Sequence, residues 1–235
     1  YQTQDPTLVD KIVLTTNNQN QISSRDLRAN HPAQLDMERA FSIYGYYYER
    51  KPRQFDGQAI DVKKLFTNEY VAQAYLAIVL KTPSDGRARK YKVWGESHSR
   101  IFSGGAVEPY IISAIIASRV TEWLRGSGST TVSDEIQRLI SKRGSFHVAR
   151  VAAYLCRHSD GWHGDQRVLA QELAEFEKTP SKLTDIIPAA FSLVVSAIKS
   201  NPTHAADVDR ALKSAALDKD IDKRLHAPSD LDQGQ

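Results

Sequence analysis

The sequence predicts a mainly α-helical protein, an irregular assembly of many helices with at most a small β hairpin. Apolar residues recur at helical spacing along most of the 235-residue chain. Capping and turn residues separate these stretches, and strand character is confined to the aromatic run 46–50. Gly and Ser residues at 126–129 form the best linker candidate. We therefore expect two lobes, an amino-terminal helical region over 1–125 and a C-terminal helical region over 129–235.

The chain should begin with two helices. Asp5 and Pro6 are typical of the start of a helix, which should end by residue 18. A second helix is expected from about residue 24 to Gly45, which is well placed to cap its end. Pro32 should bend or restart this helix, because proline cannot donate the backbone hydrogen bond of a helix interior.

A short strand or hairpin is expected next, over 46–50, with a turn at Asp56-Gly57. Thr67 should then cap a helix over 68–81. Pro83 and Gly86 are turn residues, so the segment 82–89 is predicted to be a loop.

A long helix over 108–125 is apolar on nearly every face, which is typical of a buried core helix. Its residues Ile112, Ile115, Ile116 and Trp123 should be buried. Beyond the linker, the composition favours helices throughout, with a break at Asn201-Pro202 and a frayed polar tail over 227–235. The expected helices are 133–142, 146–157, 166–178, 183–200 and 203–218.

Composition limits the setting of the protein. The single cysteine, Cys156, allows no internal disulfide, so we expect a reducing, cytoplasmic location and a small buried hydrophobe at this position. No apolar run approaches the length of a membrane span, and no membrane partner is expected. The net charge is only +3, yet the segment from Lys81 to Arg100 holds six Lys or Arg residues and two acids. The positive charge is therefore concentrated in one segment.

A polar corner follows the first helix, in the stretch KIVLTTNNQNQISSRDLRANHP. Its amides can donate and accept hydrogen bonds, so the corner could cap its own backbone or bind a partner. Both interpretations stay open. The residues of this corner are Asn17, Asn18, Gln19, Asn20, Gln21, Arg25 and Asp26.

Three runs in the first half of the chain are similar to the AIPR family, the abortive infection phage resistance proteins. They are IVLTTNNQNQISSRDLRAN, GYYYERKPRQFDG and NEYVAQAYLA, and the resemblance covers roughly 8–124. Members of that family usually carry more chain upstream, including in many a nuclease-like region. The resemblance thus implies that this chain is the carboxyl part of a larger prokaryotic defence protein, with catalysis located elsewhere.

A nuclease site is one alternative within the chain itself. Glu49-Arg50-Lys51 has the E-x-K spacing with which restriction-type nucleases hold a metal and polarise water. Asp36 or Asp56 could supply the second carboxylate. Such tripeptides arise often by chance, so Glu49 and Lys51 are weak candidates and we expect no catalytic residue here.

Other sites for metals or cofactors are not indicated. His158 and His163 flank a Gly-Trp turn near Cys156 without zinc spacing. Ser103-Gly104-Gly105 before a helix could bind an anion, but such a pair of glycines is more often a plain turn. We expect neither a metal nor a cofactor.

Basic and aromatic residues alternate in the run RARKYKVW, and a second basic cluster follows the three tyrosines 46–48. Cations bind phosphates, and aromatic rings can stack on exposed bases. The alternative is a solvated loop with Trp94 folded into the core. The candidate nucleic-acid contacts are Arg50, Lys51, Arg53, Arg87, Arg89, Lys90, Lys92 and Trp94.

These observations lead to three hypotheses about function. The first is a non-catalytic helical part of a phage-defence protein that binds DNA or RNA, or that couples recognition of infection to an upstream effector. The second is a docking or dimerisation module that contacts an upstream domain or a second copy. The third is a metal-dependent nuclease through Glu49 and Lys51. Binding to nucleic acid should depend steeply on salt, whereas apolar docking should not.

Overall fold

The computed structural model of the chain describes residues 28–88, 93–95, 97–103, 105–126, 134–160, 162 and 166–227. Within these ranges the chain is mainly helical with one small two-stranded sheet, so the predicted fold class is confirmed. The helix predicted before residue 18, the amide corner and nearly all of the polar tail lie outside the described residues.

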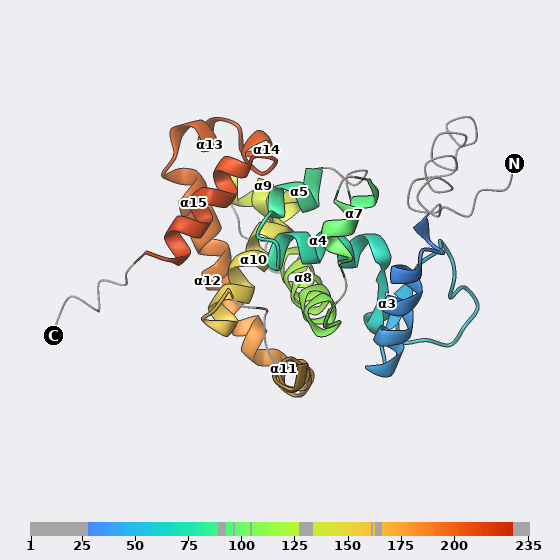
Figure 1. Cartoon of the computed structure of the whole chain (residues 1–235). Coiled ribbons are helices and arrows are strands. Elements are labelled where there is room, and N and C mark those ends of the chain that lie inside the picture. The colour runs from blue at the N-terminus through green and yellow to red at the C-terminus, as the bar shows by residue number, and fades with distance from the viewer. Residues whose placement is uncertain are drawn as a thin grey trace, which may run out of the picture. The chain divides into compact units, whose positions relative to one another are not determined.

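The chain, whose helices are labelled in Figure 1, forms two compact units. Unit 1 comprises Tyr1–Tyr70 and Lys90–Val107, and unit 2 comprises Val71–Arg89 and Glu108–Gln235. The division into regions 1–125 and 129–235 groups the residues differently, and as a division into functional domains it stays a prediction.

In unit 1, helix α3 (Pro32–Ile43) begins where the sequence predicts a restart. His31 is the N-cap, and its Nδ1 accepts the backbone N–H of Ala33 at 3.3 Å. Gly45 follows the end of the helix with a φ of 72°, a left-handed conformation that glycine adopts readily. The buried side chains of α3 are Gln34, Met37 and Phe41.

The sheet of unit 1 consists of strand β1 (Tyr47–Glu49) and strand β2 (Leu65–Thr67). The small β element is confirmed, but its strands are parallel, with Tyr48 opposite Phe66, and do not form a hairpin. Parallel strands need a long connection, which here runs through the short 3-10 helix η2 (Val62–Lys64). The rings of Tyr48 and Phe41 lie 5.0 Å apart and join the sheet to α3. Unit 1 also contains the short helix α7 (His98–Ile101).

Helix α4 (Asn68–Ile78) begins in unit 1 and continues in unit 2. Thr67 caps it as predicted, since its Oγ1 accepts the backbone N–H of Tyr70 at 3.1 Å. The loop predicted over 82–89 is wrong, because these residues contain helix α5 (Pro83–Ala88). Pro83 occupies the first helical position, where the missing N–H would have no helical partner in any case.

The centre of unit 2 is helix α10 (Ser145–Arg157), which packs against α8 (Glu108–Gly126) and α12 (Pro180–Lys199). Ile112 and Ile116 on α8 are fully buried, as predicted. Ile115 and Trp123 are only half-buried, which corrects the expectation for these two residues. They share one face of α8 with Arg119 and Glu122, so other elements cover this face only in part.

Helix α12 is the one helix, within the described ranges, that is long and apolar enough to cross a membrane by length and composition. Its apolar residues Leu183, Ile187, Val194 and Ile198 are nevertheless buried, and the helix packs against α10, α8 and α15 (Ala215–Leu225). This packing is that of a core helix. Helix α11 (Gln166–Lys178) also packs against α12 and α8.

The single helix predicted over 203–218 is wrong, because the chain forms α13 (Pro202–Ala206), α14 (Val208–Ala211) and the start of α15 there. Asp207 accepts the backbone N–H of Arg210, and Ser214 accepts that of Ala216. Asp and Ser side chains that bond the backbone start new helices and interrupt longer ones. Helix α9 (Glu135–Arg143) packs against α14.

Candidate functional site

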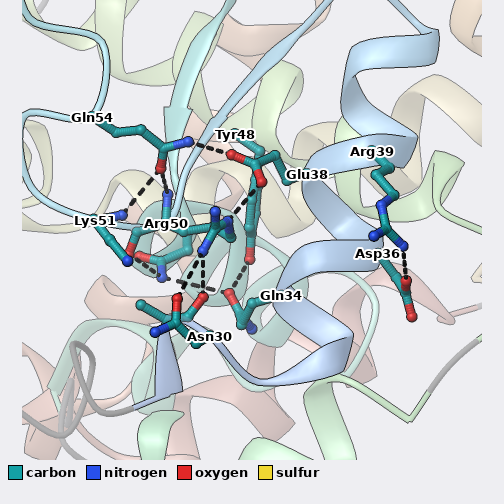
Figure 2. A network of polar contacts seen from close by, with 11 residues as sticks. Asn30, Gln34, Asp36, Glu38, Arg39, Tyr48, Arg50, Lys51 and Gln54 are labelled. Atoms are coloured by element: carbon teal, nitrogen blue, oxygen red, sulfur yellow. Dashed lines mark hydrogen bonds and ion pairs between the residues drawn. The ribbon is translucent and has the colours of Figure 1, made fainter.

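Arg50 lies at the centre of a polar network in unit 1 (Figure 2). Its Nε donates to Glu38 Oε2 at 2.8 Å, and its Nη1 donates to the backbone oxygen of Ala29 at 2.7 Å. A longer contact of 3.5 Å joins Nη1 to Asn30 Oδ1. The guanidinium is mostly buried and bonded on two sides. One side chain thus joins the end of β1 to α3 and to the residues before it.

Gln54 fixes the turn that follows β1. Its Oε1 accepts the backbone N–H groups of Arg50 and Lys51, at 3.0 and 3.3 Å, and its Nε2 donates to Glu38. Asn68 Nδ2, at the start of α4, donates to the backbone oxygen of Arg50 at 3.1 Å. Described residues of all three runs that resemble the AIPR family therefore meet in this network: Ala29 and Asn30 from the first, Arg50 and Gln54 from the second and Asn68 from the third.

Three buried polar side chains continue the network inward. The hydroxyl of Tyr48 donates to Gln34 Oε1 at 2.7 Å, and Asn68 Nδ2 lies 3.5 Å from the same oxygen. Buried amides that are bonded in this way are costly to leave without partners and specify one arrangement of the core. Sequence reasoning missed Gln34, Glu38, Gln54 and Asn68. Gln34 and Glu38 share the inward face of α3 with Phe41. This helical spacing was the sequence signal that could have identified them.

The weak nuclease candidates are not assembled into a metal site. Glu49 accepts the backbone N–H of Arg53 at 3.1 Å. Asp36 pairs with Arg39, and Asp56 pairs with Arg53, at the exposed surface. Among the described residues, no group of three or more His, Cys, Asp or Glu side chains could hold a metal ion.

The structure separates the seven cations among the candidate nucleic-acid contacts into three groups. Internal bonds occupy two of the cations, since Arg50 binds Glu38 and Arg87 Nη2 binds Asp209 Oδ1 at 2.6 Å. Lys51 and Arg53 are exposed. The residues of the third group, which lie outside the described ranges, are Arg89, Lys90 and Lys92.

Trp94 does not offer a face for base stacking in this structure. It is 3% exposed, and its ring stacks on Phe102 with the centroids 6.0 Å apart. Its large apolar surface gains more from burial than a polar residue of this segment would. Trp94 is therefore folded into the core, as the alternative interpretation expects.

His98 lies in the same cluster and is buried against His31, Trp94 and Phe102. Burial, together with the charges of Arg28 and His31, lowers the pKa of His98 to about 4. The ring is therefore neutral at pH 7, and its Nδ1 lies 3.5 Å from Arg28 Nη1. A neutral nitrogen can accept from that guanidinium.

Unit 2 contains a half-open pocket of about 380 Å³ between α10, α11 and the start of α12. Its lining includes the cations Arg157 and Lys182 and the acids Glu172 and Glu175, so the charges balance. Arg157 already pairs with Glu172 at 2.5 Å. Cys156 is buried at the wall, as predicted, and burial raises the pKa of its thiol.

Comparison with known proteins places the chain in a family. The model of the family described as AIPR protein matches residues 1–227. The chain belongs to the AIPR family. The match extends beyond the predicted 8–124 through the helices of unit 2 to α15, and AIPR membership associates the chain with abortive infection and phage defence. No curated protein and no solved structure matches this AIPR chain.

Proposed function

We propose that this chain is the non-catalytic helical part of a phage-defence protein, and that it binds the phosphate backbone of DNA or RNA in the cytoplasm. The observation that carries the proposal is the concentration of charge between Lys81 and Arg100, with six cations against Asp85 and Glu96. Lys81 and Arg87 are paired with Asp160 and Asp209, and the other four cations still outnumber the two acids of the segment. Such a surplus in one short segment repels itself, and an anionic partner relieves that repulsion.

The second basic cluster supports the same function. Lys51 and Arg53 are exposed, and the carboxylate of Asp56 lies 3.8 Å from Arg53 in a solvent-exposed pair. Such pairs contribute little, so Arg53 can exchange this partner for a phosphate at little cost. Contacts of this type carry no sequence information, so binding should be weak, salt-dependent and tolerant of sequence.

The test is fluorescence anisotropy with labelled single-stranded DNA, duplex DNA and RNA across a salt series. Replacing Arg89 and Lys90 with Ala should lower the salt slope by up to about two, since each phosphate contact contributes about one. The control replaces two exposed lysines of α11 and α12, Lys178 and Lys182, and should leave the slope unchanged. No binding by the parent protein at low salt would overturn the proposal.

A second candidate function, a docking module, is favoured by one observation. Ile43 and Val62, both in unit 1, are 82% and 75% exposed. A large apolar side chain left in water gains free energy when another protein covers it. Sedimentation velocity over a range of protein concentrations would detect self-association. If association persists at high salt and is lost in Ile43→Ser, docking replaces nucleic-acid binding as the better account.

A further inference from the structure

Three cations converge on one carboxylate in unit 2. Arg87 from α5 and Arg143 from α9 both bind Asp209 Oδ1, at 2.6 and 2.5 Å, and Lys213 Nζ binds Oδ2 at 2.5 Å. The two guanidinium nitrogens are therefore no more than about 5 Å apart, because they share one oxygen. Lys213, Arg87 and Arg143 hold the pKa of Asp209 well below its usual range. We call these four residues the Asp209 cluster.

The charge balance of this cluster differs from that of a buried structural pair. Arg150 in the same unit is almost fully buried, and it lies between two acids, Asp160 and Asp222, at 2.7 and 2.8 Å. In the Asp209 cluster, three cations share one acid, and the side chains of Arg143 and Lys213 are 50% and 49% exposed. The cluster thus keeps two surplus positive charges at the surface.

The surroundings do not cancel the surplus. Lys142 and Arg210, next to cluster members in the sequence, are exposed. The nearby acids in sequence are Asp85 on α5 and Asp207, whose carboxylate accepts the backbone N–H of Arg210. Five cations thus stand against three acids in the cluster and its flanks. Arg87 is also the first cation of the run RARKYKVW, so the cluster holds the beginning of that basic segment.

We propose that the Asp209 cluster is a phosphate-binding surface of unit 2, an inference that rests on the proposed function. The partner is the sugar–phosphate backbone of a nucleic acid. Asp209 holds the cations in place before binding, which reduces the side-chain entropy lost when a phosphate is bound. Arg143 and Lys213 contact the phosphates, and Arg87 keeps Asp209 as its own partner.

The test uses the whole chain and the double variant Arg143→Ala/Lys213→Ala, which leaves the pair of Arg87 and Asp209 intact. Anisotropy across a salt series should show a salt slope reduced by up to about two. The variant Arg143→Lys/Lys213→Arg keeps both charges and should retain the parent slope. The control variant Lys178→Ala/Lys182→Ala removes the same charge near α11, at the other end of unit 2 from α9 and α14 in Figure 1, and should bind like the parent.

The outcomes separate the two proposals. Suppose that the parent binds nucleic acid, and that the double Ala variant melts like the parent and keeps the parent's salt slope. The assignment of the Asp209 cluster as a phosphate-binding surface is then overturned, and the proposed function stands. The cluster is also overturned if the control variant loses as much slope as the double Ala variant. If the parent binds neither DNA nor RNA at low salt, both proposals fail. If the parent binds, the three probes show whether it prefers single-stranded DNA, duplex DNA or RNA.

Discussion

Arg50 shows how much of unit 1 depends on a single side chain. Its guanidinium bonds Glu38 and Ala29, so Arg50→Ala leaves Oε2 of the partly buried Glu38 carboxylate and a backbone oxygen without their donors. We expect the free energy of unfolding to fall by about 1.5–3 kcal/mol in a denaturant melt. Lys should not restore it, because one ammonium cannot reproduce the two-sided contact.

Arg39→Ala is the matched control, because its pair with Asp36 is solvent-exposed on both sides. Its cost should stay within about 0.5 kcal/mol. An Arg50→Ala variant that melts like Arg39→Ala would show that the network of Figure 2 contributes little to stability.

His98 should make stability depend on pH. Its pKa is about 4 in the folded chain, below the unfolded value near 6.5, so the unfolded chain binds more protons between these values. The contribution of the neutral His98 ring to the free energy of unfolding is complete above about pH 6.5, and it is lost as the pH falls toward 4. His98→Gln cannot titrate, so its stability should fall less than that of the parent over this window. The check is a set of denaturant melts of both proteins at several pH values. If the stability of His98→Gln falls with pH as steeply as that of the parent, His98 is not the group responsible.

At the scale of elements, the unexpected helix α5 packs closely on α4 at a glycine. A Cβ added to Gly86 would lie 2.9 Å from the backbone oxygen of Gln73, and backbone cannot move aside as a flexible side chain can. We expect Gly86→Ala to cost about 1–3 kcal/mol in a denaturant melt. At Gly126, the end of α8, no packing atom of the described residues lies within 4 Å of such a Cβ. Gly126→Ala should therefore be neutral or stabilise by up to about 1 kcal/mol, and equal effects at the two glycines would contradict this packing.

At the scale of the whole molecule, acids and cations are used mainly to hold elements together, and the described residues contain no assembled metal site. Glu49, the best carboxylate of the nuclease hypothesis, accepts a backbone N–H from Arg53. We expect the purified chain to leave plasmid DNA intact with magnesium or manganese. Nicking that disappears in Glu49→Gln would support the nuclease hypothesis instead.

The local elements of this protein could be predicted from the sequence. The helix predicted over 166–178 has the bounds of α11, and Asn201 caps α13 where the Asn-Pro break was expected. Thr67 caps α4 for the same reason. Periodicity and caps depend on residues a few positions apart, so the chain alone carries that information. The errors at α5 and at 203–218 are also local. The pattern predicts a turn at Pro83, although this residue begins a helix, and a single helix across Asp207 and Ser214, although these residues cap new ones.

The candidate site could be predicted only in part. The sequence by itself determined the helical class, the three runs shared with the AIPR family and the amount of basic charge. Only the tertiary structure decided that Arg87 is paired with Asp209, 122 positions away, and that Trp94 is buried. The parallel pairing of β1 with β2 was decided in the same way. A composition records how many cations and rings a segment has, but the partner of each depends on which distant residues the fold brings within bonding distance.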